Sequence, residues 1–486
     1  MALVIGIDSS TQSVKVEVRD AETGKVWGIG RQPHSPTTPP RSEQDPAQWW
    51  AALVQSVHEA ARYDDIAAIA VAGQQHGMVV VDEGGEVVRP AKLWNDTESA
   101  AEAAGLVDAL GAEAWAAACG SVPVAAFTIT KLAWLATHEP EAFARMSGVL
   151  LPHDWLTYRL TGRRVTDRGD ASGTGYWSPG EGRWRTDLLR MIDATVDWAP
   201  MLPLVLSPFE AAGSLLSPAA RALGMDGDRV SVAAGTGDNM AAALGVGLRP
   251  GDVAISIGTS GTVFSVSVTP TADPSGAVAG FADATGNFLP LVCTLNATKV
   301  TEAVRRLLGV DHGALDELAM QAPVGAAGLV LLPYLDGERT PNRPSATGVL
   351  AGLRSDVTAS LLARAAFEGV VCGLLDGLEA LAAAGVATDG RLFLLGGGAR
   401  SSAYRQVLAD FTQRPVVVPE ADEHVATGAC VQAACLLVAM AGGRPDPAAV
   451  AAAWGLGEGL VVEPEPGVAA AAVEARATYR ALRDSV

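Results

Sequence analysis

The sequence feature that most restricts the fold is a strand–turn–strand pattern that occurs twice. The first copy begins with the apolar run at residues 3–7, followed by the polar turn DSSTQS and the alternating run VKVEV. From Asp252 the pattern repeats as VAISI, GTSGT and VFSVSV. Apolar or alternating runs joined by short polar turns are typical of β-hairpins. The repeat predicts two halves of similar design, with a boundary within residues 244–251.

The composition fits a protein with two large domains. The chain has 486 residues, 49% of them hydrophobic, and domains usually contain roughly 100–200 residues. The net charge of −19 argues against a nucleic-acid or anionic-membrane partner. The five Cys are scattered without a CxxC pair, which predicts reduced, buried thiols. The N-terminus is read as a strand, and residues 426–441 are too short to span a membrane, so we expect a cytoplasmic protein.

Apolar periodicity along the chain predicts a mixed α/β fold. Helices are expected at residues 46–61, 100–118, 131–137, 357–385, 402–413, 424–441 and 467–482. Buried strands are expected at 66–72 and 391–397, and residues 167–183 form a loop-rich stretch.

Three polar or glycine-rich turns are candidates for binding phosphate. The chain lacks a GxxxxGK[ST] motif, so its phosphate groups would be bound by other turns. The first is Asp8–Ser13, followed by Lys15, and the second is Gly258–Thr262. Glycine permits close backbone approach, and Ser and Thr supply donors. Each turn alone has a structural explanation, but two of them, one in each half, and a third at Gly396–Gly398 favour a nucleotide site.

Two aspartates stand where a kinase needs carboxylates. Asp8 ends a buried strand and could hold Mg²⁺ through water, or could start an Asx-turn. Asp238 and Asn239 lie between a Gly-rich turn and an Ala-rich helix. Phosphoryl transfer to an alcohol needs a proton acceptor, which is commonly Asp, although Asp238 could instead be the N-cap of the helix.

The segment Gln74-Gln75-His76-Gly77 follows the predicted strand at 66–72. Ligands bind at the carboxyl ends of parallel strands, and a polyol needs mixed donors and acceptors. Amide and imidazole groups supply both, although a histidine can also brace a loop. Trp94 could offer a stacking face or belong to the core.

These motifs, taken with LWND, PYLDGERTPNRP and LGGGARS, resemble the FGGY carbohydrate kinases in order and spacing from about residue 3 to about residue 440. The resemblance implies an α/β, two-domain actin-like ATPase fold built from duplicated ribonuclease-H-like domains with an interdomain cleft. It implies an N-terminal domain at 1–247, a C-terminal nucleotide-binding domain at 248–445 and a closing helical segment at 446–486. ATP and Mg²⁺ would be the nucleotide and the metal.

The family pattern assigns roles position by position. It implies that Asp238 is the catalytic base and that Asp8 acts at the Mg²⁺–phosphate site, holding the metal through water. Sugar binding would fall to Gln75, His76, Asp238 and Asn239. The residues implied in ATP binding are Thr11, Ser13, Lys15, Thr259, Ser260, Gly397, Gly398 and Ser402.

The Q-x-H-G sequence resembles the family members that act on D-xylulose, which is therefore the expected sugar. A kinase for ribulose or another polyol, an actin-like non-kinase ATPase and a non-enzymatic sugar-binding relative stay open, as does a homodimer. Some positions depart from the family pattern: Ser10 replaces a usual Gly, Glu98 stands where Arg is frequent, and His153 in LPHDWLTYRLTG stands where Lys is commoner.

Overall fold

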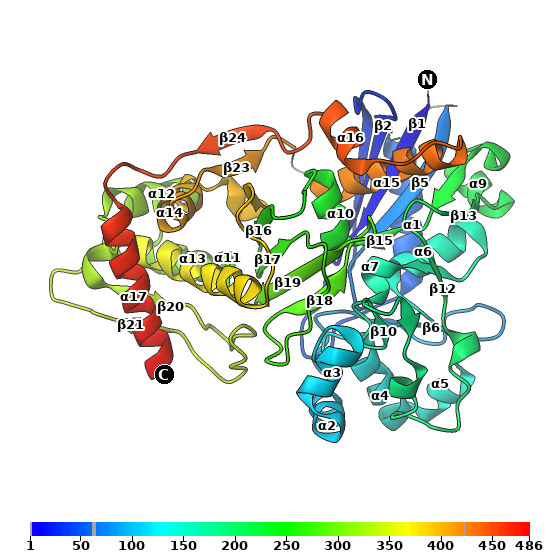
Figure 1. Cartoon of the computed structure of the whole chain (residues 1–486), viewed down its shortest axis with the longest axis horizontal. Coiled ribbons are helices and arrows are strands. Elements are labelled where there is room, and N and C mark those ends of the chain that lie inside the picture. Colours follow the sequence, from blue (N-terminus) through cyan, green and yellow to red (C-terminus); the bar gives the residue numbers. More distant parts are fainter. Residues whose placement is uncertain (1, 61–64, 422) are drawn as a thin grey trace. The chain divides into compact units, whose positions relative to one another are not determined.

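The computed structural model describes residues 2–60, 65–421 and 423–486 (Figure 1). Contacts divide the chain into two compact units. The first contains the chain up to Leu248, Val268–Leu289 and Glu423–Leu456, and the second contains Arg249–Ser267, Pro290–Asp422 and Gly457–Val486. The expected partition at 1–247, 248–445 and 446–486 stays a prediction. The contact-defined units differ from it, because residues 423–445 pack with the first unit and 446–486 are divided between the two.

The first unit contains a mixed sheet in the order β13-β14-β5-β1-β2-β3, with β15 beside β5. Its strands are β1 (Leu3–Ser9), β2 (Ser13–Asp20), β3 (Val26–Pro33), β5 (Ile66–Gly73), β13 (Ala211–Ser214), β14 (Ser231–Ala233) and β15 (Thr236–Gly237). Strands β1 and β2 form the predicted hairpin, which pairs Asp8 with Lys15. Strands β14 and β15 both run parallel to β5. The segments before Gln74 and Asp238 therefore end side by side.

Helices cover both faces of this sheet, which explains why β1 is buried along its whole length. Helix α1 (Pro46–Ala60) buries Trp49, Leu53 and Val57 in one apolar cluster with β1, β2 and β5. Helix α15 (His424–Met440) packs against β1, β5 and α10 (Asp238–Gly245). A Cβ at Gly6 would lie 2.0 Å from the Ala426 carbonyl oxygen, so only glycine allows α15 to approach β1 this closely.

The second unit repeats this pairing pattern. Its strands follow the order β19-β17-β16-β22-β23-β24, and they are β16 (Val253–Ile257), β17 (Gly261–Ser265), β19 (Phe288–Thr294), β22 (Leu392–Leu395), β23 (Val416–Pro419) and β24 (Gly459–Val462). Strands β16, β17 and β19 pair antiparallel, whereas β22 runs parallel to β16 and β23 parallel to β22. Strands β1, β2, β3, β5 and β14 pair in the same way. The predicted duplication is therefore confirmed at the level of topology.

The long helical patterns are confirmed, with one break. Helices α13 (Ala359–Ala383), α14 (Ser402–Thr412) and α17 (Ala469–Ser485) match the expected segments of the second unit. The single helix expected at 100–118 is wrong: Gly111, with φ of 89°, separates α2 (Ala100–Leu110) from α3 (Ala112–Cys119). The backbone leaves the helical region there, and glycine has no Cβ to oppose a positive φ.

Further helices and strands complete the two units. The first unit also contains β4 (Glu43–Gln44), β6 (Val79–Val81), β7 (Ala91–Lys92), α4 (Thr128–His138), α5 (Pro140–Arg145), β8 (Gly148–Leu150), α6 (Pro152–Thr161), β9 (Val165–Asp167), α7 (Arg168–Ala171), β10 (Trp177–Ser178), β11 (Arg183–Trp184), α8 (Thr186–Leu189), β12 (Leu204–Leu206), α9 (Ser217–Leu223), β18 (Ala279–Ala282) and α16 (Pro447–Ala453). The second unit also contains α11 (Thr298–Leu308), α12 (His312–Gln321), β20 (Val330–Leu332), β21 (Val349–Ala351) and a 3₁₀ turn at Gly397–Arg400. All five cysteines are free and buried. Among the described helices, none has the length and apolar character needed to cross a bilayer.

Candidate active site

Asp238 is the first residue of α10, at the helix end where backbone N–H groups favour a negative charge. Gly237 is the N-cap, so the alternative that Asp238 caps the helix is wrong. The Asp238 Oδ1 atom accepts hydrogen bonds from the Asn239 backbone N–H at 2.8 Å and from Asn239 Nδ2 at 2.9 Å. Burial and, secondarily, the charge of Asp8 raise the pKa of Asp238 to about 7. A carboxylate of this pKa can take up and release a proton near neutral pH.

Asn239 joins Asp238 to Gln75. Its Nδ2 also donates to Gln75 Oε1 at 2.8 Å, so the two amides and the carboxylate form one hydrogen-bonded chain. Gln75 is buried, and its Nε2 has no hydrogen-bond partner among the described residues. A buried donor without a partner is costly, so a ligand acceptor at this position would satisfy it. The hydroxyls of a polyol are such acceptors.

His76 is held in one orientation beside this chain. Its backbone has φ of 66°, an uncommon conformation for a residue other than glycine. The imidazole Nδ1 lies 2.8 Å from the Gly173 carbonyl oxygen, to which its N–H donates. The ring packs against Phe127 and Phe281, with centroid distances of 5.0 and 5.4 Å. The prediction that His76 binds sugar is compatible with this fixed position and stays a prediction.

Asp8 lies at the other predicted catalytic position and is buried. Its Oδ1 accepts from the Ser10 hydroxyl, and its Oδ2 lies 3.5 Å from Lys15 Nζ. Lys15 also forms an ion pair with Glu423 at 2.7 Å. Burial raises the pKa of Asp8, and Lys15 and Ser10 offset part of this rise. A second cation near this carboxylate would be favourable, which fits the predicted Mg²⁺ site.

The first phosphate turn is braced by hydrogen bonds to two neighbouring loops. The Thr11 hydroxyl donates to Gln74 Oε1 at 3.0 Å and accepts from Trp94 Nε1 at 2.9 Å. Thr11 is therefore engaged with the protein at its hydroxyl, and Trp94 supports the turn through its indole. Ser13 is buried at the start of β2. Their predicted contacts with ATP stay predictions.

In the second unit, backbone bonds from α11 fix the turn between β16 and β17. The Gly258 carbonyl accepts from the Thr298 N–H at 2.9 Å, and the Thr259 carbonyl accepts from the Ala297 N–H at 3.1 Å. Both hydrogen bonds are accepted by backbone carbonyl oxygens, so they do not involve the side chains of the turn. Thr259 is exposed and Ser260 half-buried. Both side chains keep solvent contact, as the prediction that they bind ATP requires.

The Gly-rich turn after β22 leaves room for a ligand at one position. A Cβ at Gly397 would meet nothing within 4 Å, whereas one at Gly398 would lie 2.4 Å from Ile257 Cγ2. Gly397 is thus open to a ligand, and Gly398 is required for packing. The Ser402 hydroxyl and backbone N–H both donate to Asp316 Oδ2, at 3.2 and 2.8 Å. Ser402 has this role at the start of α14 whether or not it binds ATP.

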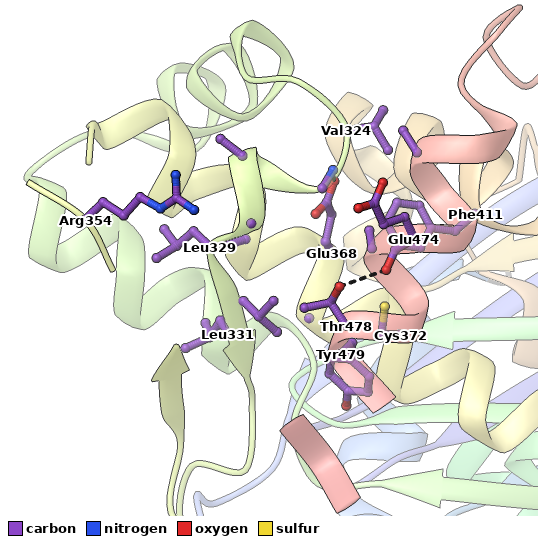
Figure 2. Close-up of a pocket in the computed structure, with 18 residues that line it drawn as sticks. Val324, Leu329, Leu331, Arg354, Glu368, Cys372, Phe411, Glu474, Thr478 and Tyr479 are labelled. Atoms are coloured by element: carbon purple, nitrogen blue, oxygen red, sulfur yellow. Dashed lines mark hydrogen bonds between the residues drawn. The ribbon is translucent and has the colours of Figure 1, made fainter. Parts of the chain in front are cut away.

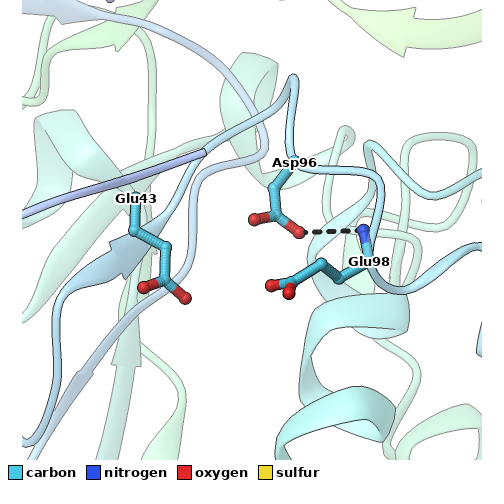
Figure 3. Close-up of side chains that lie close together, drawn as sticks. All are labelled: Glu43, Asp96 and Glu98. Atoms are coloured by element: carbon cyan, nitrogen blue, oxygen red, sulfur yellow. Dashed lines mark hydrogen bonds between the residues drawn. The ribbon is translucent and has the colours of Figure 1, made fainter. Parts of the chain in front are cut away.

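A group of acidic residues near β4 has the spacing of a metal site but already holds a cation. Oxygens of Glu43, Asp96 and Glu98 lie within 4.8 Å of one another (Figure 3). The Lys92 ammonium lies 3.1 Å from Asp96 Oδ1 and 3.4 Å from Glu43 Oε1, and it pairs with Glu98 as well. It also lies 3.8 Å from the centre of the Trp134 ring. Glu98, which stands where the family pattern usually has Arg, is therefore part of a structural ion-pair network.

The second unit contains a hollow of about 380 Å³ that involves none of the predicted site residues. Its lining comes from residues 324–331, α13 and α17, and includes Arg354, Glu368 and Glu474 (Figure 2). The Glu368 carboxylate is already paired with Arg364 at 2.6 Å. The hollow is therefore separate from the candidate site.

Sequence reasoning missed a group of charged residues that contacts the segment leading to Asp238. His153 is surrounded by Asp154, Asp167 and Asp170, and Asp167 accepts a hydrogen bond from Thr236 at 2.8 Å. The only signals in the sequence were the family departure at His153 and the run DRGDASG, which we interpreted as a loop. The stretch 167–183, which we expected to be rich in loops, contains α7, β10 and the first residue of β11.

Comparison with known proteins defines the class of this protein. The chain matches the model of the FGGY family of carbohydrate kinases, N-terminal domain, over residues 3–245, and the C-terminal domain model over residues 253–437. The protein is thus a phosphotransferase with an alcohol group as acceptor. It belongs to the FGGY family of carbohydrate kinases.

Similar proteins carry a more specific name. The chain is 48% identical to a xylulose kinase of Streptomyces coelicolor over 471 residues, which is 95% of this chain and 92% of that protein. It is 38% identical to a xylulose kinase of Escherichia coli, over 84% and 85% of the two chains. The crystal structure of a xylulose kinase from Bifidobacterium adolescentis matches with a TM-score of 0.86 and 41% identity, over 98% of this chain and 99% of that chain.

Proposed function

We propose that this protein phosphorylates D-xylulose to D-xylulose 5-phosphate with ATP. The observation that carries the proposal is the hydrogen-bonded chain Gln75–Asn239–Asp238 beside His76. This chain brings together an amide donor without a partner, Gln75 Nε2, and a carboxylate of raised pKa, Asp238. Both residues follow the ends of the paired strands β5 and β15. The names of the similar proteins support D-xylulose as the sugar.

In this mechanism Asp238 is the general base. Its carboxylate accepts the proton of the sugar's 5-hydroxyl as that oxygen attacks the γ-phosphorus of ATP. A bond forms between this oxygen and phosphorus, and the bond from phosphorus to the β–γ bridging oxygen breaks, so that ADP leaves. Asn239 keeps Asp238 oriented, and Gln75, His76 and Asn239 hold the sugar hydroxyls.

Charge on the phosphates is balanced near Asp8. We propose that Asp8 holds Mg²⁺ through water and that Lys15 lies beside the phosphates, since the two side chains are 3.5 Å apart. When bound, Mg²⁺ would neutralise charge on the β- and γ-phosphates. Thr11 and Ser13 would complete this turn. In the second unit, Thr259, Ser260, Gly397, Gly398 and Ser402 are proposed to bind the nucleotide.

A substrate panel tests the proposed sugar. The purified protein is assayed for ADP release with ATP and Mg²⁺ in the presence of D-xylulose, D-ribulose, glycerol or no sugar. We expect D-xylulose to give a kcat/KM at least about tenfold above D-ribulose, a discrimination that a few hydrogen bonds can supply. A preference for ribulose would assign the other pentulose, and equal ADP release without sugar would favour a non-kinase ATPase.

The activity should depend on pH through Asp238. A base must be deprotonated, and burial raises the pKa of this carboxyl to about 7, so kcat/KM for D-xylulose should rise with pH through about 7 and level off above it. At saturating ATP and Mg²⁺, we expect about a tenfold loss per pH unit below pH 6. A profile that is flat between pH 5.5 and pH 8 would contradict this assignment.

A further inference from the structure

A buried ionic cluster of one histidine and three aspartates contacts the segments that carry the candidate site residues. The Nε2 atom of His153 lies 3.2 Å from Asp154 Oδ1, 3.4 Å from Asp167 Oδ1 and 3.3 Å from Asp170 Oδ2. The side chains of His153, Asp154 and Asp170 are 0% exposed. Buried carboxylates this close together need a neutralising cation or bound protons. Burial lowers the pKa of His153, but the three carboxylates outweigh it and raise the pKa to about 9, while burial also raises the pKa of Asp170.

The cluster contacts the segment that carries Asp238. The Asp167 Oδ2 atom accepts from the Thr236 hydroxyl at 2.8 Å, two residues before Asp238. A Cβ at Gly235 would lie 2.7 Å from His153 Nδ1, so the ring packs against this backbone. Gly235 also has φ of 82°, which a side chain would oppose. The imidazole therefore packs against the turn that leads into α10.

The same cluster contacts the segments that carry Gln75 and His76. A Cβ at Gly73 would lie 3.1 Å from His153 Cβ, which places His153 against the end of β5, two residues before Gln75. Asp170 is in α7. The Gly173 N–H donates to the Asp170 carbonyl oxygen at 2.9 Å, and this hydrogen bond closes the turn after the helix. The Gly173 carbonyl in turn accepts from His76 Nδ1. The cluster thus contacts both chain segments that carry the proposed sugar-binding residues, one with Gln75 and His76 and the other with Asp238 and Asn239.

We propose that His153 is a positioning residue for phosphoryl transfer: its ring, held by Asp154, Asp167 and Asp170, keeps Asp238 in line with the sugar bound by Gln75 and His76. This inference rests on the proposed function, because it takes Asp238 as the base. The His153 side chain is 0% exposed, so in this proposal it acts through the neighbouring segments. Displacing a reacting group by about 1 Å can cost about 10²-fold in rate, so loosening the cluster should act mainly on kcat.

The test compares His153→Gln, which removes the cation, with His153→Lys, which replaces it by another cation. We expect His153→Gln to lower kcat with D-xylulose at least about tenfold, with KM for ATP changed less than about twofold. His153→Lys should recover kcat to within about threefold of the wild type. His138→Gln is the matched control, because His138 also pairs with a carboxylate, at 3.0 Å from Glu102, but is exposed.

A purely structural role predicts a different pattern. Both His153 variants would then melt at lower temperature while the folded enzyme kept the wild-type kcat, and this result would overturn the inference. If His153→Gln fails to fold, Thr236→Val provides the test, because it removes only the hydrogen bond from the Thr236 hydroxyl to Asp167. A loss of kcat of about tenfold in this variant would support the inference, and an unchanged kcat would overturn it.

The two proposals fail in distinguishable ways. If Asp238→Asn kept the wild-type kcat, the base assignment would be wrong, and the inference that the cluster positions Asp238 would fall with it. If Asp238→Asn lost kcat while both His153 variants kept it, this inference alone would be overturned. A wild type that phosphorylates no sugar of the panel would overturn the proposed function and this inference together.

Discussion

Replacing Asp238 with Asn is expected to lower kcat for D-xylulose by about 10²–10⁴-fold, the usual contribution of a general base. The substitution preserves shape, and an amide oxygen can still accept from the Asn239 N–H as Oδ1 does now at 2.8 Å. KM for ATP should change little, because the carboxylate acts on the sugar hydroxyl. Steady-state kinetics with coupled ADP detection measure both quantities.

The fold of this variant should persist. Burial raises the pKa of Asp238, so the ionised carboxylate is unfavourable for the folded state, and its removal should leave the thermal midpoint at pH 8 unchanged or slightly higher. Asn239→Asp is not a suitable control, because it adds a charge to the site. Asp193, whose carboxylate accepts from the N–H and the hydroxyl of Thr195, provides one as Asp193→Asn. A kcat within threefold of wild type in Asp238→Asn would refute the base assignment.

Replacing Asp8 with Asn is expected to lower kcat/KM for ATP by about 10²-fold or more. Metal and charge stabilisation at a transferring phosphoryl group is worth several kcal/mol, and each 1.36 kcal/mol is about tenfold in rate. The change removes the negative charge beside Lys15 while keeping the shape of the side chain. The measurement is the dependence of the rate on ATP concentration at fixed, saturating sugar and Mg²⁺.

The matched control lies at the other end of the same hairpin. Asp20 Oδ1 accepts from the Glu22 and Thr23 N–H groups, and Asn can accept the same bonds. Asp20→Asn should therefore leave kcat/KM for ATP within about twofold of wild type, because Asn keeps these hydrogen bonds and Asp20 has no place in the proposed site. Equal effects at Asp8 and Asp20 would indicate that Asp8 only stabilises the hairpin.

Much of the fold was predictable because its signals are local. The apolar runs at residues 3–7 and 253–257 are each followed by a short polar turn and a second strand, and both form the predicted hairpins. Long apolar periodicities such as 359–383 gave helices close to their predicted ends. The break at Gly111 was missed because a single glycine is tolerated inside many helices, so the sequence alone did not distinguish the two outcomes.

The supporting contacts of the site were not predictable in the same way. His153 and Asp170 are 17 residues apart in the sequence and lie in different helices, α6 and α7. Only the fold brings their charges together. Gln432 is a polar residue within the apolar stretch 426–441, and only the fold shows that its Nε2 donates to the Gly235 carbonyl at 2.8 Å. Similarly, Glu98 was noted as a family departure, and its partner Lys92 was identified only in the folded chain.

The most direct test of the central claim is the identity of the product. The protein is incubated with ATP, Mg²⁺ and D-xylulose, and the sugar phosphate is analysed by ³¹P and ¹H NMR alongside measurement of ADP. The account predicts one ADP per sugar phosphate, with phosphorus coupled to the protons on C5, and almost no product from Asp238→Asn. ADP without a phosphorylated sugar, or phosphate at a different hydroxyl, would contradict it.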